Sequence, residues 1–144
     1  INGIETLPLR MQRHCENTLA VAVYLERHPA VAWVNYAGLP GNPYNAIQKK
    51  ICPNGAGAVF TFGLKGGYEA GVKLVASLKL FSHLANIGDT RSLVIHPAST
   101  THRQLTDEQR AAAGAGSDVV RLSVGIEDKD DIIADLDQAL DKVS

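Results

Sequence analysis

The stretch "DVVRLSVGIEDKDDIIADLDQAL", residues 118–140, decides the fold expected for this chain. In its first half, the apolar residues Val120, Leu122 and Val124 occupy every second position, and Arg121 is one of the residues between them. This alternation is typical of a strand buried on one face. The run ends at Gly125, before an acidic helix start. The apolar face of that helix is formed by Ile132, Ile133, Leu136, Ala139 and Leu140.

Working outward from this stretch, the rest of the chain reads as alternating helices and strands. Periodicity predicts helices over residues 8–28 and 68–80, a short helix from Pro43 capped by Asn42, and a helix opened by a Thr106/Gln109 capping box and ended at Gly114. Strands are predicted over residues 31–36, 58–64, 83–87, 92–96 and 119–124. Asp128 is expected to cap the last helix. The predicted fold class is α/β: a two-layer sandwich with a small, mostly antiparallel or mixed sheet and helices on one face.

Length and composition narrow the class of protein. A chain of 144 residues, 45% apolar and 20% charged, is expected to form a single domain. A net charge of −1 offers no basic field for nucleic acid or for an anionic membrane. The longest uncharged run, residues 31–48, is broken by turn formers, so no membrane span is expected. Cys15 and Cys52 lack metal-binding spacing, which favours reduced thiols and a cytoplasmic location.

Most potential chemical motifs have a simpler structural interpretation. The five histidines are scattered along the chain: His14, His28, His83, His96 and His102. No two of them have the i, i+4 spacing that binds zinc on a helix, so no metal site is assigned. The glycine-rich link "LKGGYEAG", residues 64–71, matches neither the dinucleotide fingerprint nor the P-loop. Cys15 falls on the apolar stripe of a helix, where cysteine acts as a small hydrophobe.

Arg121 remains as a candidate functional residue, together with Asn86. An arginine inside a strand costs desolvation energy unless an anion neutralises it, and its planar fork suits a carboxylate. The anion is either an aspartate or glutamate of this chain or a ligand. The pattern alone leaves both alternatives open.

Three segments carry a resemblance to a known family. They are "ETLPLRMQRHCENT" (residues 5–18), "GDTRSLVIHPASTTH" (residues 88–102) and "VVRLSVGIEDKDDIIADLDQAL" (residues 119–140). Together they resemble, in collinear order, the C-terminal domain of the Cys/Met-metabolism family of pyridoxal-phosphate enzymes, which have fold type I. The motifs "GDTRSL" and "STTH" are most similar to those of the O-acetylhomoserine sulfhydrylases.

The resemblance implies a reaction and roles for three residues. Pyridoxal 5'-phosphate would act as electron sink while acetate leaves O-acetylhomoserine and sulfide or a small thiol replaces it, giving homocysteine or methionine. Arg121 aligns with the arginine that binds the substrate α-carboxylate. Asn86 falls where many relatives have a serine that touches the same group, and an amide can donate that hydrogen bond. Thr101 lies in the family's "TH" motif near the site.

One departure from the family implies that the chain is a fragment. None of its seven lysines has the serine-x-threonine-lysine setting of the Schiff-base lysine, and the chain begins with Ile1. Residues 1–144 are therefore expected to be a single C-terminal domain that binds the substrate carboxylate, with no catalytic or cofactor-binding residue of its own. The N-terminal cofactor domain would be its partner, in a full-length homotetramer, and the fragment alone would be inactive.

Two other functions remain open at this point. In the first, the chain is a free-standing domain that binds amino acids without catalysing a reaction, an alternative based on its length and its anion-binding arginine. Alternatively, the chain belongs to another member of the same family, such as a cystathionine γ-synthase or a methionine γ-lyase.

Overall fold

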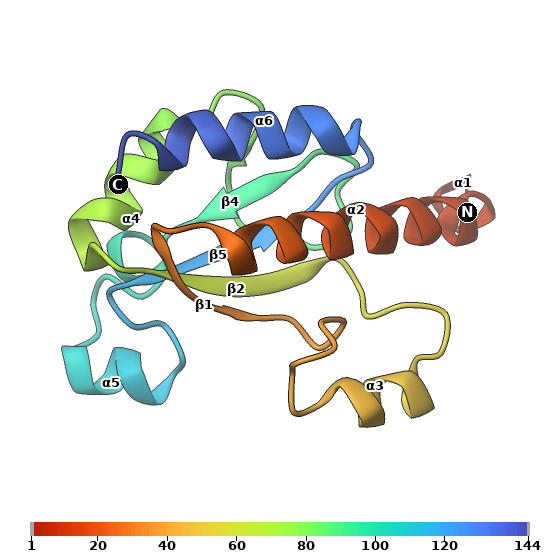
Figure 1. Ribbon diagram of the computed structural model, residues 1–144, viewed down its shortest axis with the longest axis horizontal. Coiled ribbons are helices and arrows are strands. Elements are labelled where there is room, and N and C mark those ends of the chain that lie inside the picture. Colours follow the sequence, from red (N-terminus) through yellow and green to blue (C-terminus); the bar gives the residue numbers. More distant parts are fainter. Residues whose placement is uncertain (1, 144) are drawn as a thin grey trace.

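The computed structural model describes residues 2–143 as one sheet with surrounding helices (Figure 1). The helices are α1 (Asn2–Glu5), α2 (Leu7–Arg27), α3 (Asn45–Ile51), α4 (Gly67–Ser77), α5 (Asp107–Ala112) and α6 (Lys129–Leu140), with a 3₁₀ turn at Pro97–Ser99. The strands are β1 (Val31–Asn35), β2 (Val59–Leu64), β3 (Ser82–His83), β4 (Leu93–Ile95) and β5 (Val119–Ser123).

The sheet has the order β1-β2-β5-β4-β3. Its β1–β2, β2–β5 and β4–β5 pairs are antiparallel, and only the β3–β4 pair is parallel. The expected α/β fold with a small, mostly antiparallel, mixed sheet is therefore confirmed. β5 lies at the centre, so its residues are bounded by strands on both sides.

The three long helices α2, α4 and α6 form the second layer. Figure 1 shows α2 and α6 side by side over the strands, and α4 contacts both α6 and the central strands. In this view the short helices α3 and α5 lie on the opposite side of the strands. The hydrophobic core lies between the layers, because the largest fully buried side chains come from both: Leu25, Phe62, Leu74, Leu122, Ile132, Leu136 and Leu140.

Three helix boundaries, the start and end of α5 and the start of α6, follow the local capping chemistry predicted from the sequence. The Thr106 hydroxyl accepts from the Gln109 backbone N–H, and the Gln109 side chain returns a bond to the Thr106 N–H, which completes the capping box. The Asp128 carboxylate accepts from the Asp130 N–H at the start of α6. Gly114, at φ +67°, follows the end of α5 in the left-handed conformation that glycine adopts readily.

Three predicted boundaries were wrong. Helix α3 begins at Asn45 because Asn42 accepts from the Tyr44 N–H within the preceding turn and does not cap a helix from Pro43. Helix α4 ends at Ser77, since Leu78 is extended. The strand predicted over residues 83–87 includes only His83 of that range, and the backbone after it bends away.

Within residues 2–143, no helix is both long enough and apolar enough to cross a bilayer.

Candidate anion-binding site around Arg121

Arg121 lies in the middle of β5, on the side of the sheet away from the three long helices. Its Cα is paired with Thr61 of β2 and Ile95 of β4. The strand neighbours Val120 and Leu122 are fully buried in the core, whereas Arg121 is half-buried. The alternation read from the sequence therefore places the guanidinium as predicted, opposite the core face.

The guanidinium has no carboxylate partner in the part of the chain that the structure describes. Its Nη2 donates to the backbone oxygen of Asn86 at 3.4 Å, a long hydrogen bond. The ion pairs found among residues 2–143 belong to Arg13, Arg91 and Arg110. The internal ion pair that the sequence left open for Arg121 is therefore not formed among these residues.

Asn86 lies next to Arg121, but the contact between them is made by the backbone oxygen of Asn86 and not by its side chain. Its side chain is exposed, and its Oδ1 accepts from the N–H of Ile87 at 2.9 Å. The side-chain amide nitrogen is the atom able to donate to a carboxylate. Its contact with a substrate stays a prediction.

Thr101 is exposed and lies two residues after the 3₁₀ turn at Pro97–Ser99. Its Oγ1 is 2.8 Å from Nδ1 of His102. No hydrogen bond joins Thr101 to Arg121 or Asn86 within the described residues, so the structure brings together two of the three predicted site residues and leaves Thr101 outside that pair.

Ser123 is a further candidate for this site, which the sequence reasoning did not single out. It lines the same tight recess as Arg121 and Asn86. Only 4% of Ser123 is exposed, and its Oγ is buried without a hydrogen-bond partner. A buried hydroxyl without a partner is costly, which makes it a candidate for contact with a ligand or water. The signal was present in the sequence, because strand alternation puts Ser123 on the Arg121 side.

Helix α2 fixes the loop that leaves β5. His14 Nδ1 lies 2.6 Å from the oxygen of Val124, and the Asn17 amide donates to the oxygens of Gly125 and Glu127 at 3.0 and 2.8 Å. His14 and Asn17 are almost completely buried. These bonds hold the end of the strand that carries Arg121.

The segment before β4 fixes the same loop from the other side. The Glu127 carboxylate accepts from the N–H and the hydroxyl of Ser92, at 2.6 and 2.9 Å. The Ser92 hydroxyl in turn accepts from the Gly125 N–H at 2.9 Å. The three sequence motifs thus meet at residues 124–127, and their polar side chains hold the backbone around Arg121.

The turn between Asn86 and β4 carries its own ion pair. Asp89 accepts from the backbone N–H of Arg91 at 3.0 Å and from the Arg91 guanidinium at 3.3 Å. These hydrogen bonds hold the pKa of the Asp89 carboxyl below its ordinary value. Arg91 is therefore engaged locally and differs in this respect from Arg121.

Comparison with known proteins identifies the family. The family model for Cys/Met metabolism PLP-dependent enzymes matches residues 1–141. The chain belongs to this family. O-acetyl-L-homoserine sulfhydrylase 1 from Thermus thermophilus is 56% identical over 138 residues, covering 96% of this chain and 33% of that protein. L-methionine gamma-lyase from Fusobacterium nucleatum subsp. polymorphum is 48% identical over 143 residues, covering 99% of this chain and 36% of that protein.

A solved structure agrees in fold. A Campylobacter jejuni protein described as an O-acetylhomoserine (thiol)-lyase, with N'-pyridoxyl-lysine-5'-monophosphate, superimposes with a TM-score of 0.90 at 42% identity. The match covers 97% of this chain and 33% of that one. The chain therefore spans about a third of the length of the relatives that it matches.

The lysines of this chain do not fit the attachment of the family's cofactor. All seven are exposed, and none lines the recess beside Arg121: Lys49, Lys50, Lys65, Lys73, Lys79, Lys129 and Lys142. A Schiff-base lysine works from an enclosed site where its amine loses its proton readily. The described lysines therefore offer no enclosed amine of that kind.

Proposed function

We propose that this chain is the C-terminal, substrate-carboxylate-binding domain of an O-acetylhomoserine sulfhydrylase. The whole enzyme would exchange the acetyl group of O-acetylhomoserine for sulfide or a small thiol, yielding acetate and homocysteine or methionine. The observation that carries the proposal is Arg121, a guanidinium in mid-strand without a carboxylate partner among residues 2–143. The similarity to a Thermus thermophilus protein named O-acetyl-L-homoserine sulfhydrylase supports the choice of substrate.

In this proposal Arg121 binds both oxygens of the substrate α-carboxylate. Two parallel, charge-assisted hydrogen bonds fix the orientation of the amino acid as well as its position. Arg121 already donates to the Asn86 oxygen, which leaves most of its five N–H groups for the carboxylate. The Asn86 amide would add one donor, and Thr101 would support the site from the adjacent segment.

The chain itself would not catalyse the reaction. Its lysines are all exposed, so the pyridoxal phosphate would be held by the N-terminal domain of the full-length protein. The two parts would complete one site, with this chain anchoring the carboxylate. The homotetrameric assembly and the cytoplasmic location expected from the family resemblance belong to the same proposal, and two free thiols at Cys15 and Cys52 suit a reducing compartment.

The test is Arg121→Lys in the full-length protein, assayed with O-acetylhomoserine and sulfide. Lysine keeps the charge but loses the two-pronged contact, so we expect kcat/KM to fall by roughly tenfold to a hundredfold. The matched control is Arg27→Lys, at an exposed arginine on the last turn of α2. Unchanged kcat/KM in Arg121→Lys would remove Arg121 from the site.

A substrate variant assigns the loss to the carboxylate. With the α-carboxamide of O-acetylhomoserine, the wild type should lose much of its efficiency, because the amide carries no charge for the guanidinium. Arg121→Lys should then discriminate less between the acid and the amide. Equal discrimination by both proteins would show that Arg121 acts on another part of the substrate.

A methionine γ-lyase is the second candidate, because a protein of that name is 48% identical over 99% of this chain. It retains the carboxylate anchor and changes only the chemistry at the γ-carbon. Elimination from methionine, assayed beside the exchange of O-acetylhomoserine with sulfide, distinguishes the two. A parallel assay of O-succinylhomoserine with cysteine tests the cystathionine synthase activity.

A further inference from the structure

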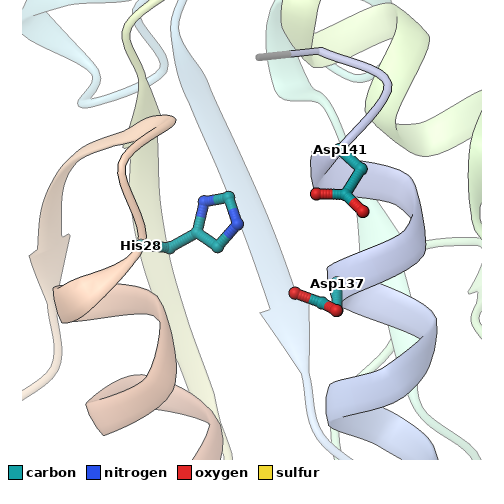
Figure 2. A group of neighbouring side chains, drawn as sticks. All are labelled: His28, Asp137 and Asp141. Atoms are coloured by element: carbon teal, nitrogen blue, oxygen red, sulfur yellow. The ribbon is translucent and has the colours of Figure 1, made fainter.

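A second cluster of polar side chains lies away from Arg121, where α2 and α6 end. His28 is the C-cap of α2, and Asp137 and Asp141 follow one another by a helical turn at the end of α6. One ligand atom from each residue lies within 4.8 Å of the other two. Figure 2 shows the His28 ring facing the two carboxylates across the gap between the helices. We propose that these three residues bind a divalent transition-metal ion of the Zn²⁺ type.

The electrostatic surroundings favour a cation at this place. Neither Asp137 nor Asp141 forms an ion pair with a described lysine or arginine. Lys142, the nearest basic residue along the chain, donates to Gln138. The C-terminal ends of two helices also converge here, and each carries partial negative charge on its last carbonyl groups. Two carboxylates held together without a counter-ion repel each other, and a bound cation relieves that repulsion.

A hydrogen bond from outside the cluster orients one of the ligands. The Tyr24 hydroxyl donates to Oδ1 of Asp137, the kind of outer contact that fixes a metal-binding carboxylate. The Nδ1 atom of His28 lies 3.2 Å from the Ala30 N–H, so Nε2 is the nitrogen turned toward the carboxylates. Binding through Nε2 moves the ring proton to Nδ1 and gives up this long hydrogen bond.

The ligand set selects the class of ion. An imidazole nitrogen with two carboxylate oxygens suits Zn²⁺ and its neighbours, whereas Mg²⁺ and Ca²⁺ prefer oxygen ligands alone. Ligand atoms on one Zn²⁺ lie about 2.0–2.2 Å from the ion. Ligand atoms that lie up to 4.8 Å apart can approach such an ion by rotation of the exposed side chains of Asp137 and Asp141.

Calorimetric titration of the intact, chelator-treated protein with ZnCl₂ tests the proposal. We expect His28→Gln and Asp141→Asn each to weaken or abolish one binding event by at least tenfold, relative to the wild type. Tyr24→Phe, which removes only the outer contact, should weaken the same event by about tenfold. The matched control is Asp131→Asn, an exposed carboxylate in the first turn of α6, which should bind as the wild type does.

Other zinc ligands of the intact protein are present in every variant, so only the difference between variants counts. Circular dichroism establishes that each variant is folded, and Asp141→Asn replaces His28→Gln if the latter is not. A change smaller than tenfold in both of these variants overturns the proposal, as does an equal loss in Asp131→Asn. As a second readout, the rise in Tm on adding ZnCl₂ should disappear in the two ligand variants.

Discussion

Asp135 joins α6 to the segment that leads from α4 into β3, and its removal gives a sharp test of how this fold is held. The carboxylate is 8% exposed and accepts backbone hydrogen bonds from Lys79 at 3.0 Å, Leu80 at 2.8 Å and Phe81 at 3.4 Å. Gln138 donates to the same carboxylate at 3.0 Å. One side chain therefore satisfies three consecutive N–H groups that no regular element serves.

The expected magnitude follows from these bonds. A hydrogen bond to a charged acceptor contributes about 1.5–3 kcal/mol, and a buried donor left unpaired costs about 1–3 kcal/mol. Because Lys79 and Leu80 are exposed, water replaces part of what they lose. We expect Asp135→Ala to lower the free energy of unfolding by about 3 kcal/mol, equivalent to a fall in Tm of roughly 10 °C for a chain of this size. Asp135→Asn keeps one acceptor and should cost about 2 kcal/mol.

Urea unfolding followed by far-ultraviolet circular dichroism measures this difference, provided that the m-value is unchanged. Asp131→Ala removes an exposed carboxylate from the same helix and should cost less than about 1 kcal/mol. If Asp135→Ala and Asp131→Ala were equally stable, the three backbone bonds would not hold the segment before β3, and the reasoning would be refuted.

Two further predictions concern crowding and pH. An ideal Cβ at Gly125 would lie 2.5 Å from Ser92 N and from Thr90 O. Gly125→Ala should therefore lower the free energy of unfolding, measured in urea, by more than about 2 kcal/mol. The control Gly41→Ala, whose Cβ meets nothing within 4 Å, should be nearly neutral. Burial raises the pKa of Tyr24, aided by its hydrogen bond to Asp137, and burial also raises the pKa of Tyr36. Both hydroxyls should keep their protons above pH 10.0, where an unfolded chain loses them, so stability should be full below that pH and fall as the pH rises toward the folded values. A tyrosinate absorbance titration that is complete for all four tyrosines near pH 10.0 would contradict this.

The parts of the fold that were predictable are those that nearby residues determine. Asp128 and the Thr106/Gln109 pair start helices through bonds within one turn, and strand alternation places Arg121 opposite the core. These signals act over a few residues, so the sequence contains them in full. The start of α3 was missed because asparagine is favoured both in turns and at helix N-caps, and the residues around Asn42 suit either role. In the structure Asn42 takes the turn role.

The parts that were missed depend on residues far apart in the chain. The partners of Arg121 could not be read from its neighbours, because Asn86 lies 35 residues away. In the sequence, His28 is one of five scattered histidines, yet folding places it beside Asp137 and Asp141. The buried bonds of Asp135 with residues 79–81 likewise arise only when α6 packs beside α4. The spacing of residues within a single helix or strand carries no information about such long-range contacts.

The place of β5 at the centre of the sheet has a consequence for how the chain is made. Val119–Ser123 is the last strand along residues 2–143, yet it pairs with both β2 and β4. Until it leaves the ribosome, those two strands present unpaired edges that can pair with another chain. His14 must also wait for Val124, 110 residues later, before its buried nitrogen finds an acceptor. Folding is therefore delayed until most of the chain has been synthesised, and a nascent chain without β5 should need protection from aggregation.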